Sequence, residues 1–145
     1  MKIVVQRSKA ASVSVEGKTV GKIESGYVLL VCCEKGDSES TLKKAATKII
    51  ELRPFPDEQG KMNLNLAYYG GEILAISQFT LSWDGKKGNR PSFDNSMAPE
   101  KAALFFDKFC ELLEQHSKVS RGLFGGKMEV SLTNWGPVTF SLSFQ

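Results

Sequence analysis

The stretch GYVLLVCCE, Gly26–Glu34, is a continuous run of β-branched and apolar residues. Such a run is typical of a strand that is buried on both faces. A second run of the same kind, EILAISQF from Glu72 to Phe79, begins directly after a Gly-Gly pair. The two runs predict buried strands at the centre of the fold.

Further strands are predicted on either side of these runs. Upstream, MKIVVQR and ASVSVEG have the pattern of two strands joined by a short polar turn, and the second alternates with period two. Downstream, we expect two or three strands at the end of the chain, including MEVSL and VTFSLSF. Strands therefore form the majority of the predicted elements.

Two helices complete the prediction. GDSESTLKKAATKIIELRP has helical apolar spacing, with Asp37 and Ser38 as N-cap candidates. PEKAALFFDKFCELLEQH is amphipathic, with an apolar face rich in Phe and Leu. Since the chain shows no internal repeat, linker or low-complexity tract, residues 1–145 are predicted to form a single mixed α/β domain.

The composition is that of a globular protein, with 41% hydrophobic and 24% charged residues among 145. A net charge of +3 is compatible with a polyanionic partner without requiring one. The three cysteines lack the spacing of a disulfide framework, so we expect reduced, buried thiols. With no signal peptide and no apolar run of membrane-spanning length, we expect a soluble, cytoplasmic protein with no membrane partner.

Several classes of active site are disfavoured. His116 is the only histidine, and it lies near the end of a predicted helix, where the helix dipole alone favours it. There is no HExxH, CxxC pair or His/Cys/Asp cluster, so we expect no metal and no cofactor. RGLFGGK has the wrong glycine spacing for a phosphate loop.

A polar cluster at the end of the second buried run is the first candidate site. The apolar strand gives way to Ser77-Gln78-Phe79-Thr80, and alternation would point Ser77 and Phe79 one way and Gln78 and Thr80 the other. One interpretation is a strand end that simply becomes exposed. The other is a pocket of hydroxyls, an amide and backbone N–H groups that stabilises an oxyanion without a strong base.

A polar loop follows, from Ser82 to Ser96, and loops of this length are often functional. It carries three cations that would suit phosphate contacts on a nucleic acid, namely Lys86, Lys87 and Arg90. An ordinary solvated loop is the alternative interpretation.

The segment TNWGPVTF, Thr133–Phe140, places Gly136-Pro137 between two stretches that alternate like strands. Proline donates nothing to a β-ladder and glycine has no side chain to pack, so this pair is unusual in a strand. The residues alone do not explain the interruption.

The chain as a whole resembles the D-aminoacyl-tRNA deacylases. The most specific matches are Ser77-Gln78-Phe79-Thr80 and the segment Asn134-x-Gly136-Pro137-Val138-Thr139. The resemblance extends through LRPFPDEQGKMNLNL, KKGNRPSF and GLFGGKMEVSL. Members often carry Asp where this chain has Trp135, and two arginines where it has Asn89-Arg90.

This resemblance implies a strand-rich, β-barrel-like core and a homodimer with its active site at the interface. The implied reaction is hydrolysis of the ester between a D-amino acid and the terminal adenosine of tRNA. It further implies that Gly136-Pro137 has a cis peptide bond and turns backbone carbonyls toward the substrate's chiral centre in the partner's site. Arg7 matches the arginine that orients this segment, which also includes Asn134 and Thr139. Phe79, Phe124 and Met128 match positions of an adenine pocket, although each could equally belong to the core.

Two mechanisms remain open at this point. Thr80 could act as a nucleophile, but no activating base is visible nearby in the sequence. We favour attack by water assisted by the vicinal hydroxyl of the RNA, with backbone N–H groups around Gln78–Thr80 stabilising the developing charge. The alternatives in function are a deacylase of the same fold acting on glycyl- or other mischarged tRNA, and a non-catalytic nucleic-acid-binding module.

Overall fold

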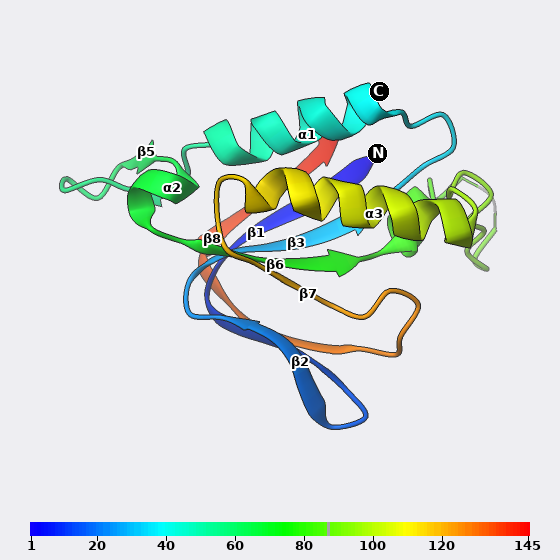
Figure 1. Ribbon diagram of the computed structural model, residues 1–145, viewed down its shortest axis with the longest axis horizontal. Coiled ribbons are helices and arrows are strands. Elements are labelled where there is room, and N and C mark those ends of the chain that lie inside the picture. The colour runs from blue at the N-terminus through cyan, green and yellow to red at the C-terminus, as the bar shows by residue number, and fades with distance from the viewer. Residues whose placement is uncertain (87) are drawn as a thin grey trace.

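Six strands form one sheet in the computed structural model, which describes residues 1–86 and 88–145 (Figure 1). They are β1 (Lys2–Val15), β2 (Lys18–Ile23), β3 (Gly26–Cys32), β6 (Glu72–Ser77), β7 (Val119–Arg121) and β8 (Glu129–Ser143). The order is β2-β1-β3-β6-β7, in which β3 and β2 pair with successive parts of one edge of β1. β8 pairs with the opposite edge of β1. β1 pairs with its three neighbours in antiparallel fashion, whereas β3–β6 and β6–β7 are parallel.

The first strand is continuous, so the prediction of two strands with a turn between them is wrong. β1 pairs with β3 up to Ser8↔Gly26 and with β2 from Ala11↔Ile23 onward. The polar residues between these ladders are the point where β1 changes partner. The strand continues through it because β8 pairs with β1 on the opposite edge on both sides of this point.

The two ends of the sheet approach each other, which makes the sheet a nearly closed barrel. Ser120 Oγ, on β7, donates a hydrogen bond of 2.9 Å to the carbonyl of Lys22 on β2. A Cβ atom at Gly21 would lie 2.9 Å from the carbonyl oxygen of Arg121. Glycine is therefore required at this close approach between β2 and β7.

Both predicted helices are present and lie on one side of the sheet, as α1 (Glu39–Glu51) and α3 (Pro99–Glu114) (Figure 1). Five elements were not predicted: the strand β2 (Lys18–Ile23), the hairpin of β4 (Phe55–Pro56) and β5 (Met62–Leu64), α2 (Leu66–Tyr69), and the 3-10 helix η1 (Phe79–Ser82). Within the described residues, no helix has the length and apolar character needed to cross a membrane.

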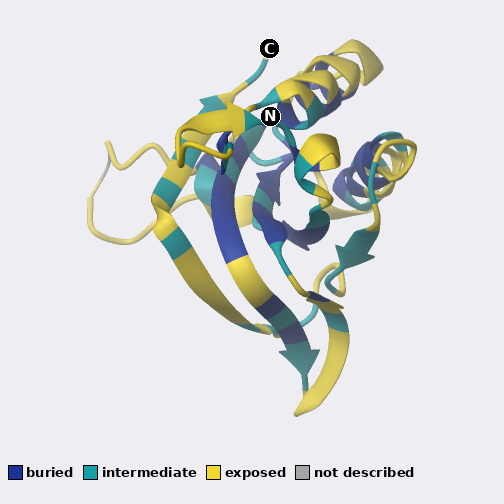
Figure 2. Ribbon diagram, turned by 90° about the vertical axis from the view of Figure 1, so that its left-hand side faces the viewer, coloured by how far each residue is buried: buried dark blue, intermediate teal, exposed yellow. Residues whose placement is uncertain are grey.

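β3 separates two hydrophobic clusters, as expected of a strand buried on both faces. Tyr27, Leu29 and Val31 pack in the larger cluster, which includes buried residues of both long helices. Val28 points into a smaller cluster with residues of β1, β2 and β6. β8, in contrast, is partly or fully exposed along its whole length (Figure 2).

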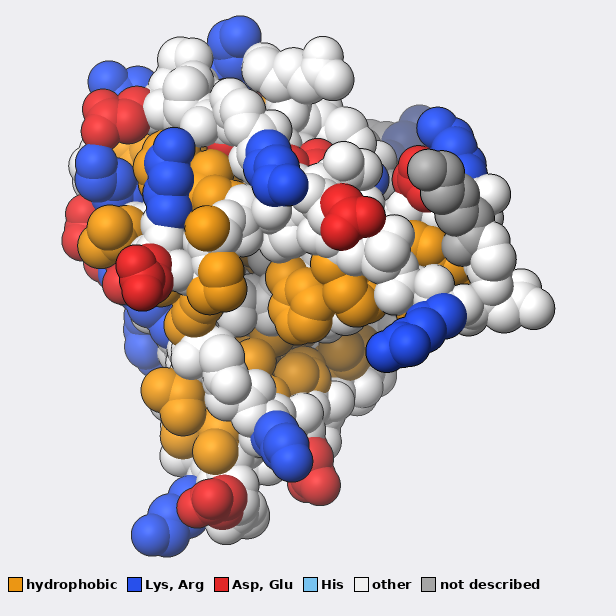
Figure 3. Space-filling view, turned by 90° about the vertical axis from the view of Figure 1, so that its right-hand side faces the viewer, with side chains coloured by type: hydrophobic (Ala, Val, Ile, Leu, Met, Phe, Trp, Pro, Cys, Tyr) orange, Lys and Arg blue, Asp and Glu red, His pale blue; other side chains and the backbone are white. Residues whose placement is uncertain are grey.

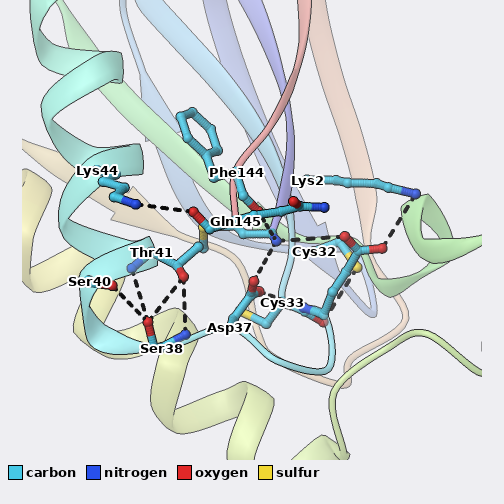
Figure 4. A network of polar contacts seen from close by, with 12 residues as sticks. Lys2, Cys32, Cys33, Asp37, Ser38, Ser40, Thr41, Lys44, Phe144 and Gln145 are labelled. Carbon is cyan, nitrogen blue, oxygen red and sulfur yellow. Dashed lines mark hydrogen bonds and ion pairs between the residues drawn. The ribbon is translucent and has the colours of Figure 1, made fainter.

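Polar contacts around Asp37 hold the turn between β3 and α1 (Figure 4). The carboxylate of Asp37 lies 2.6 Å from the terminal ammonium of Met1 and accepts a 2.7 Å hydrogen bond from the N–H of Glu34. Of the two N-cap candidates it is Ser38 that caps α1, through a hydrogen bond from Thr41 N–H. Asp37 thus fixes the chain just beyond the end of β3.

Candidate functional site

The chain turns sharply where the second apolar run ends. β6 stops at Ser77 and η1 begins at Phe79, so the strand alternation predicted through Thr80 is wrong. Gln78 makes the turn with φ −143° and ψ 73°, and its N–H donates a 2.7 Å hydrogen bond to the carbonyl of Val31. The polar cluster is consequently a strand end followed by a short helix.

This turn lies at a cavity of about 420 Å³ between the end of β6, the loop before α3 and the loop before β8. Figure 3 shows hydrophobic side chains gathered in a hollow on this side of the molecule. The lining is mostly apolar: Val31, Cys32, Cys33, Ser77, Gln78, Phe79, Phe93, Ser96, Met97, Ala98, Pro99, Ala102, Phe106, Phe124 and Gly125. An apolar cavity with a few polar groups at one side is the usual form of a small-ligand site.

The four residues of the predicted cluster do not have equivalent places. Ser77, Gln78 and Phe79 line the cavity, whereas Thr80 does not. The side-chain amide of Gln78 donates a 2.6 Å hydrogen bond to Thr80 Oγ1. The ring of Phe79 is 57% exposed and meets Phe93 edge to face, with centroids 4.9 Å apart.

Two backbone N–H groups are available beside the cavity. Phe79 and Thr80 are the first residues of η1, and their N–H groups have no hydrogen-bond acceptor among the described residues. This is normal at the beginning of a helix. The N–H of Gln78, which the sequence placed among the candidate oxyanion donors, instead donates to the carbonyl of Val31. The set of free donors is therefore smaller than predicted.

The described residues that line the cavity include no carboxylate, imidazole or amine. Their ionisable groups are the thiols of Cys32 and Cys33, and burial raises the pKa of these thiols to about 11 and about 12 respectively. Both thiols are therefore neutral near pH 7. These described residues provide neither a general base nor a charged nucleophile at that pH.

Phe124 and Met128, both expected in the adenine pocket, lie in different parts of the structure. Phe124 lines it and lies 6.2 Å from the ring of Phe106. Met128 is absent from the lining and packs against the smaller hydrophobic cluster inside the barrel. Of these two, Phe124 alone is placed to contact a ligand in the cavity.

The Gly136-Pro137 segment lies within β8 rather than between strands. β8 runs continuously from Glu129 to Ser143, but its pairing with β1 jumps from Ser8↔Asn134 to Gln6↔Thr139. Four residues of β8 therefore stand opposite Arg7 alone. Within this bulge the Gly136–Pro137 peptide bond is cis. A bulge explains how a Gly-Pro pair fits within a strand.

Side chains of β1 hold this bulge in place. Arg7 Nε donates to the carbonyl of Trp135 at 2.8 Å, and Gln6 Nε2 donates to the carbonyl of Val138 at 3.1 Å. Thr139 Oγ1 donates to Gln6 Oε1 at 2.6 Å, and Asn134 Oδ1 accepts from the N–H of Val138 at 3.3 Å. Of these residues, Gln6 was missed from the sequence, although a polar side chain within an apolar strand was a signal.

The model of the family described as D-Tyr-tRNA(Tyr) deacylase matches residues 4–143. The chain belongs to this family.

Curated relatives of the same family are similar over nearly their full lengths. The D-aminoacyl-tRNA deacylase of Saccharophagus degradans is 49% identical over 144 residues, which is 99% of this chain and 99% of the relative. That of Bacillus velezensis is 51% identical over 140 residues, covering 96% of this chain and 95% of the relative.

Two solved structures are also similar. The c-Myc DNA Unwinding Element Binding Protein has a TM-score of 0.94 and 38% identity, covering 99% of this chain and 98% of that one. A probable eukaryotic D-amino acid tRNA deacylase has a TM-score of 0.81 and 16% identity, with 97% of both chains covered, and supports the fold alone. The mixed α/β, barrel-like fold is thus confirmed.

The cavity and the bulge of β8 are separate features of this deacylase-family chain. None of Arg7, Asn134, Gly136, Pro137 or Thr139 is among the residues that line the cavity.

The two described loop cations, Lys86 and Arg90, have no contact with described residues that assigns them a role. Lys86 is exposed and lies 3.7 Å from the carboxylate of Asp84. Arg90 is also exposed. Lys87 lies outside the described residues.

Proposed function

We propose that this chain, in the cytoplasm, hydrolyses the ester between a D-amino acid and the 3′-terminal adenosine of tRNA. Its family and its curated deacylase relatives support an ester hydrolase of this kind. The observation that carries the proposal is the apolar cavity lined by Ser77–Phe79, where the described residues offer two free main-chain N–H groups and no ionisable base. Such a site suits an ester, whose hydrolysis needs oxyanion stabilisation more than a strong base.

The cavity would bind the terminal adenosine. Phe79 and Phe124 offer aromatic faces to a base, and the rest of the lining is apolar. With the base in the cavity, the ester carbonyl would lie at its mouth near the N–H groups of Phe79 and Thr80. These donors would stabilise the negative charge that develops on the carbonyl oxygen during attack.

Water is the proposed nucleophile. It attacks the carbonyl carbon and gives up a proton, the bond between that carbon and the ribose oxygen breaks, and the departing ribose oxygen takes up the proton that the water released. The vicinal hydroxyl of the ribose is placed to relay that proton, so the tRNA itself supplies the group that the cavity lacks. No metal and no cofactor enters these steps.

Selection of the D-form is assigned to the partner subunit's Gly136–Pro137 in a homodimer. Backbone carbonyls directed at the chiral centre would exclude an L-side chain by steric clash. They would make no contact with a D-side chain, so D-amino acids of different kinds would be accepted. The bonds of Arg7 and Gln6 to this bulge support such a role, because a filter must hold its position. Glycine, which lacks a side chain, would escape the filter, so some hydrolysis of glycyl-tRNA is expected.

A second candidate function is binding of a nucleic acid without catalysis. The exposed Lys86 and Arg90 suit phosphate contacts, and one relative at 38% identity is described as a DNA unwinding element binding protein. The apolar cavity disfavours this alternative as the main function, since phosphate contacts do not need it.

One experiment separates these functions. Purified protein is incubated with D-Tyr-tRNA, L-Tyr-tRNA and Gly-tRNA, and loss of each ester is followed. We expect rapid loss of the D-ester, slow loss of the L-ester and measurable loss of the glycyl ester. Absence of D-ester turnover would leave the binding function, and equal turnover of D- and L-esters would refute the filter. Preference for the glycyl ester would favour the other deacylase class.

The dimer has its own test. Sedimentation velocity at assay concentrations is expected to give the mass of two chains. A monomer that remains fully active would contradict the assignment of Gly136–Pro137 to the neighbouring site.

A further inference from the structure

Arg7 is a buried cation with an unusual set of partners. Its side chain is 8% exposed, and among the described residues no carboxylate lies within ion-pair distance of it. Within the described residues, its hydrogen bonds go to two main-chain carbonyls, those of Trp135 at 2.8 Å and Pro54 at 2.5 Å. A buried charge must be stabilised by its surroundings, and two neutral carbonyls stabilise the charge of Arg7 only weakly.

The ring of Trp135 supplies further compensation. The guanidinium carbon of Arg7 lies 4.4 Å from the centre of this ring, and Lys9 Nζ lies 3.5 Å from it. Cations over an indole face are attracted by its quadrupole, most strongly where water is excluded. Trp135 therefore faces two cations of β1 that are two residues apart.

The same ring is anchored to the core. Trp135 lies 5.7 Å from Tyr69 and 6.3 Å from Phe55, and those two rings are stacked at 4.3 Å. Phe55 is fully buried. The indole is thus held between an aromatic cluster and the cations of β1.

Trp135 also precedes Gly136 directly, and its carbonyl accepts the hydrogen bond from Arg7 Nε. One residue therefore meets the same guanidinium with both its ring and its carbonyl. Because the carbonyl belongs to the peptide that joins Trp135 to Gly136, fixing it fixes the orientation of the chain entering Gly136–Pro137.

We propose that Trp135 is a positioning residue for chiral selection. It compensates the charge of Arg7, and together the two residues set the direction of the Gly136–Pro137 carbonyls. This inference rests on the proposed function, which it deepens by assigning specificity to a side chain outside the cavity that does not itself touch substrate.

The test uses Trp135→Ala, with Trp135→Phe as the conservative variant. Tyr68→Ala serves as control, since Tyr68 is 83% exposed and directly precedes Tyr69 of the aromatic cluster in the sequence. We expect Trp135→Ala to lower the ratio of D-Tyr-tRNA to L-Tyr-tRNA turnover about tenfold, mainly through kcat, because loss of a desolvated cation–π contact is of that order. Trp135→Phe should recover most of the ratio, and the control should retain it.

An unchanged D-to-L ratio in Trp135→Ala would overturn the proposal. This holds whether the rates themselves stay the same or fall by an equal factor on both esters, as a purely structural role predicts. Thermal unfolding of each variant, measured in parallel, ensures that the ratio is determined on folded protein.

A second measurement does not depend on activity. The Nε–H of Arg7 should be protected from hydrogen exchange by NMR in the wild type and in Trp135→Phe, and should lose protection in Trp135→Ala. Unchanged protection in Trp135→Ala would overturn the positioning role. If the wild type fails to hydrolyse the D-ester, the proposed function fails, while this exchange measurement still decides whether Trp135 positions Arg7.

Discussion

The side-chain amide of Gln78 donates a 2.6 Å hydrogen bond to Thr80 Oγ1. The hydroxyl oxygen of Thr80 thus accepts a hydrogen bond from an amide, a group that cannot remove the hydroxyl proton. A threonine nucleophile requires an adjacent base. The contact with Gln78 instead suits a structural role, in which the two side chains hold the first turn of η1.

Replacement of Thr80 by Ala should therefore leave most of the deacylase activity. We expect the single-turnover rate on D-Tyr-tRNA to stay within about tenfold of the wild type, because the main-chain N–H of residue 80 remains. Thr80→Ser is the matched control, since it keeps the hydroxyl. A loss of about 10⁴-fold in Thr80→Ala, with Thr80→Ser active, would identify Thr80 as the nucleophile.

Gly136→Ala should abolish selective hydrolysis. Gly136 has φ +149°, and a Cβ atom there would lie 2.6 Å from the backbone nitrogen of Val138, so the bulge must move. We expect the rate on D-Tyr-tRNA to fall about 100-fold or more, the loss typical of a misplacement of about 1 Å. Gly60→Ala is the control, because Gly60 also has positive φ but no neighbour within 4 Å. Full activity of Gly136→Ala would contradict the proposed filter.

Asp37→Asn should destabilise the protein. The carboxylate of Asp37 is buried against the ammonium of Met1 at 2.6 Å, and removing its charge leaves that ammonium without its principal partner. We expect a loss of about 3 kcal/mol in the free energy of unfolding, measured by urea denaturation. Glu39→Gln breaks an exposed ion pair with Lys108 and should leave the free energy of unfolding almost unchanged, because water screens such a pair. Similar effects of the two substitutions would refute the importance of burial.

The buried thiols predict a loss of stability in alkali. Burial raises the pKa of Cys32 to about 11 and that of Cys110 to about 12, whereas an unfolded thiol titrates near pH ~8.5. Above pH ~8.5 the unfolded chain releases protons that the folded chain retains, so the free energy of unfolding falls as pH rises toward the folded pKa values. Denaturation between pH 8 and 11 measures this slope, and Cys110→Ala should reduce it. An equal slope in the variant would show that Cys110 does not contribute.

The sequence was informative where local pattern determines structure. The apolar run of β3 predicted burial on both faces, and the spacing in α1 and α3 predicted their amphipathic packing. Of the predicted group Ser77-Gln78-Phe79-Thr80, the first three residues line the cavity. Each of these features depends on residues that are close in sequence.

The features that were missed depend on distant pairing. The continuity of β1 could not be predicted, because its polar middle section is supported by β8, more than 120 residues away. The four-residue bulge opposite Arg7 has the same origin. The turn at Gln78 likewise depends on the carbonyl of Val31, which belongs to a neighbouring strand.

The pairing of β1 with β8 has a consequence for the order in which the molecule is completed. The ladder joins Lys2 to Ser143, so it closes a loop of almost the entire chain, and such long-range contacts form slowly. During synthesis, the residues that line the cavity leave the ribosome before Gly136 and Pro137 do. The cavity can thus assemble before the bulge forms its contacts with β1. If Gly136–Pro137 selects the D-form as proposed, discrimination between mirror-image substrates is the last property that a newly made chain gains.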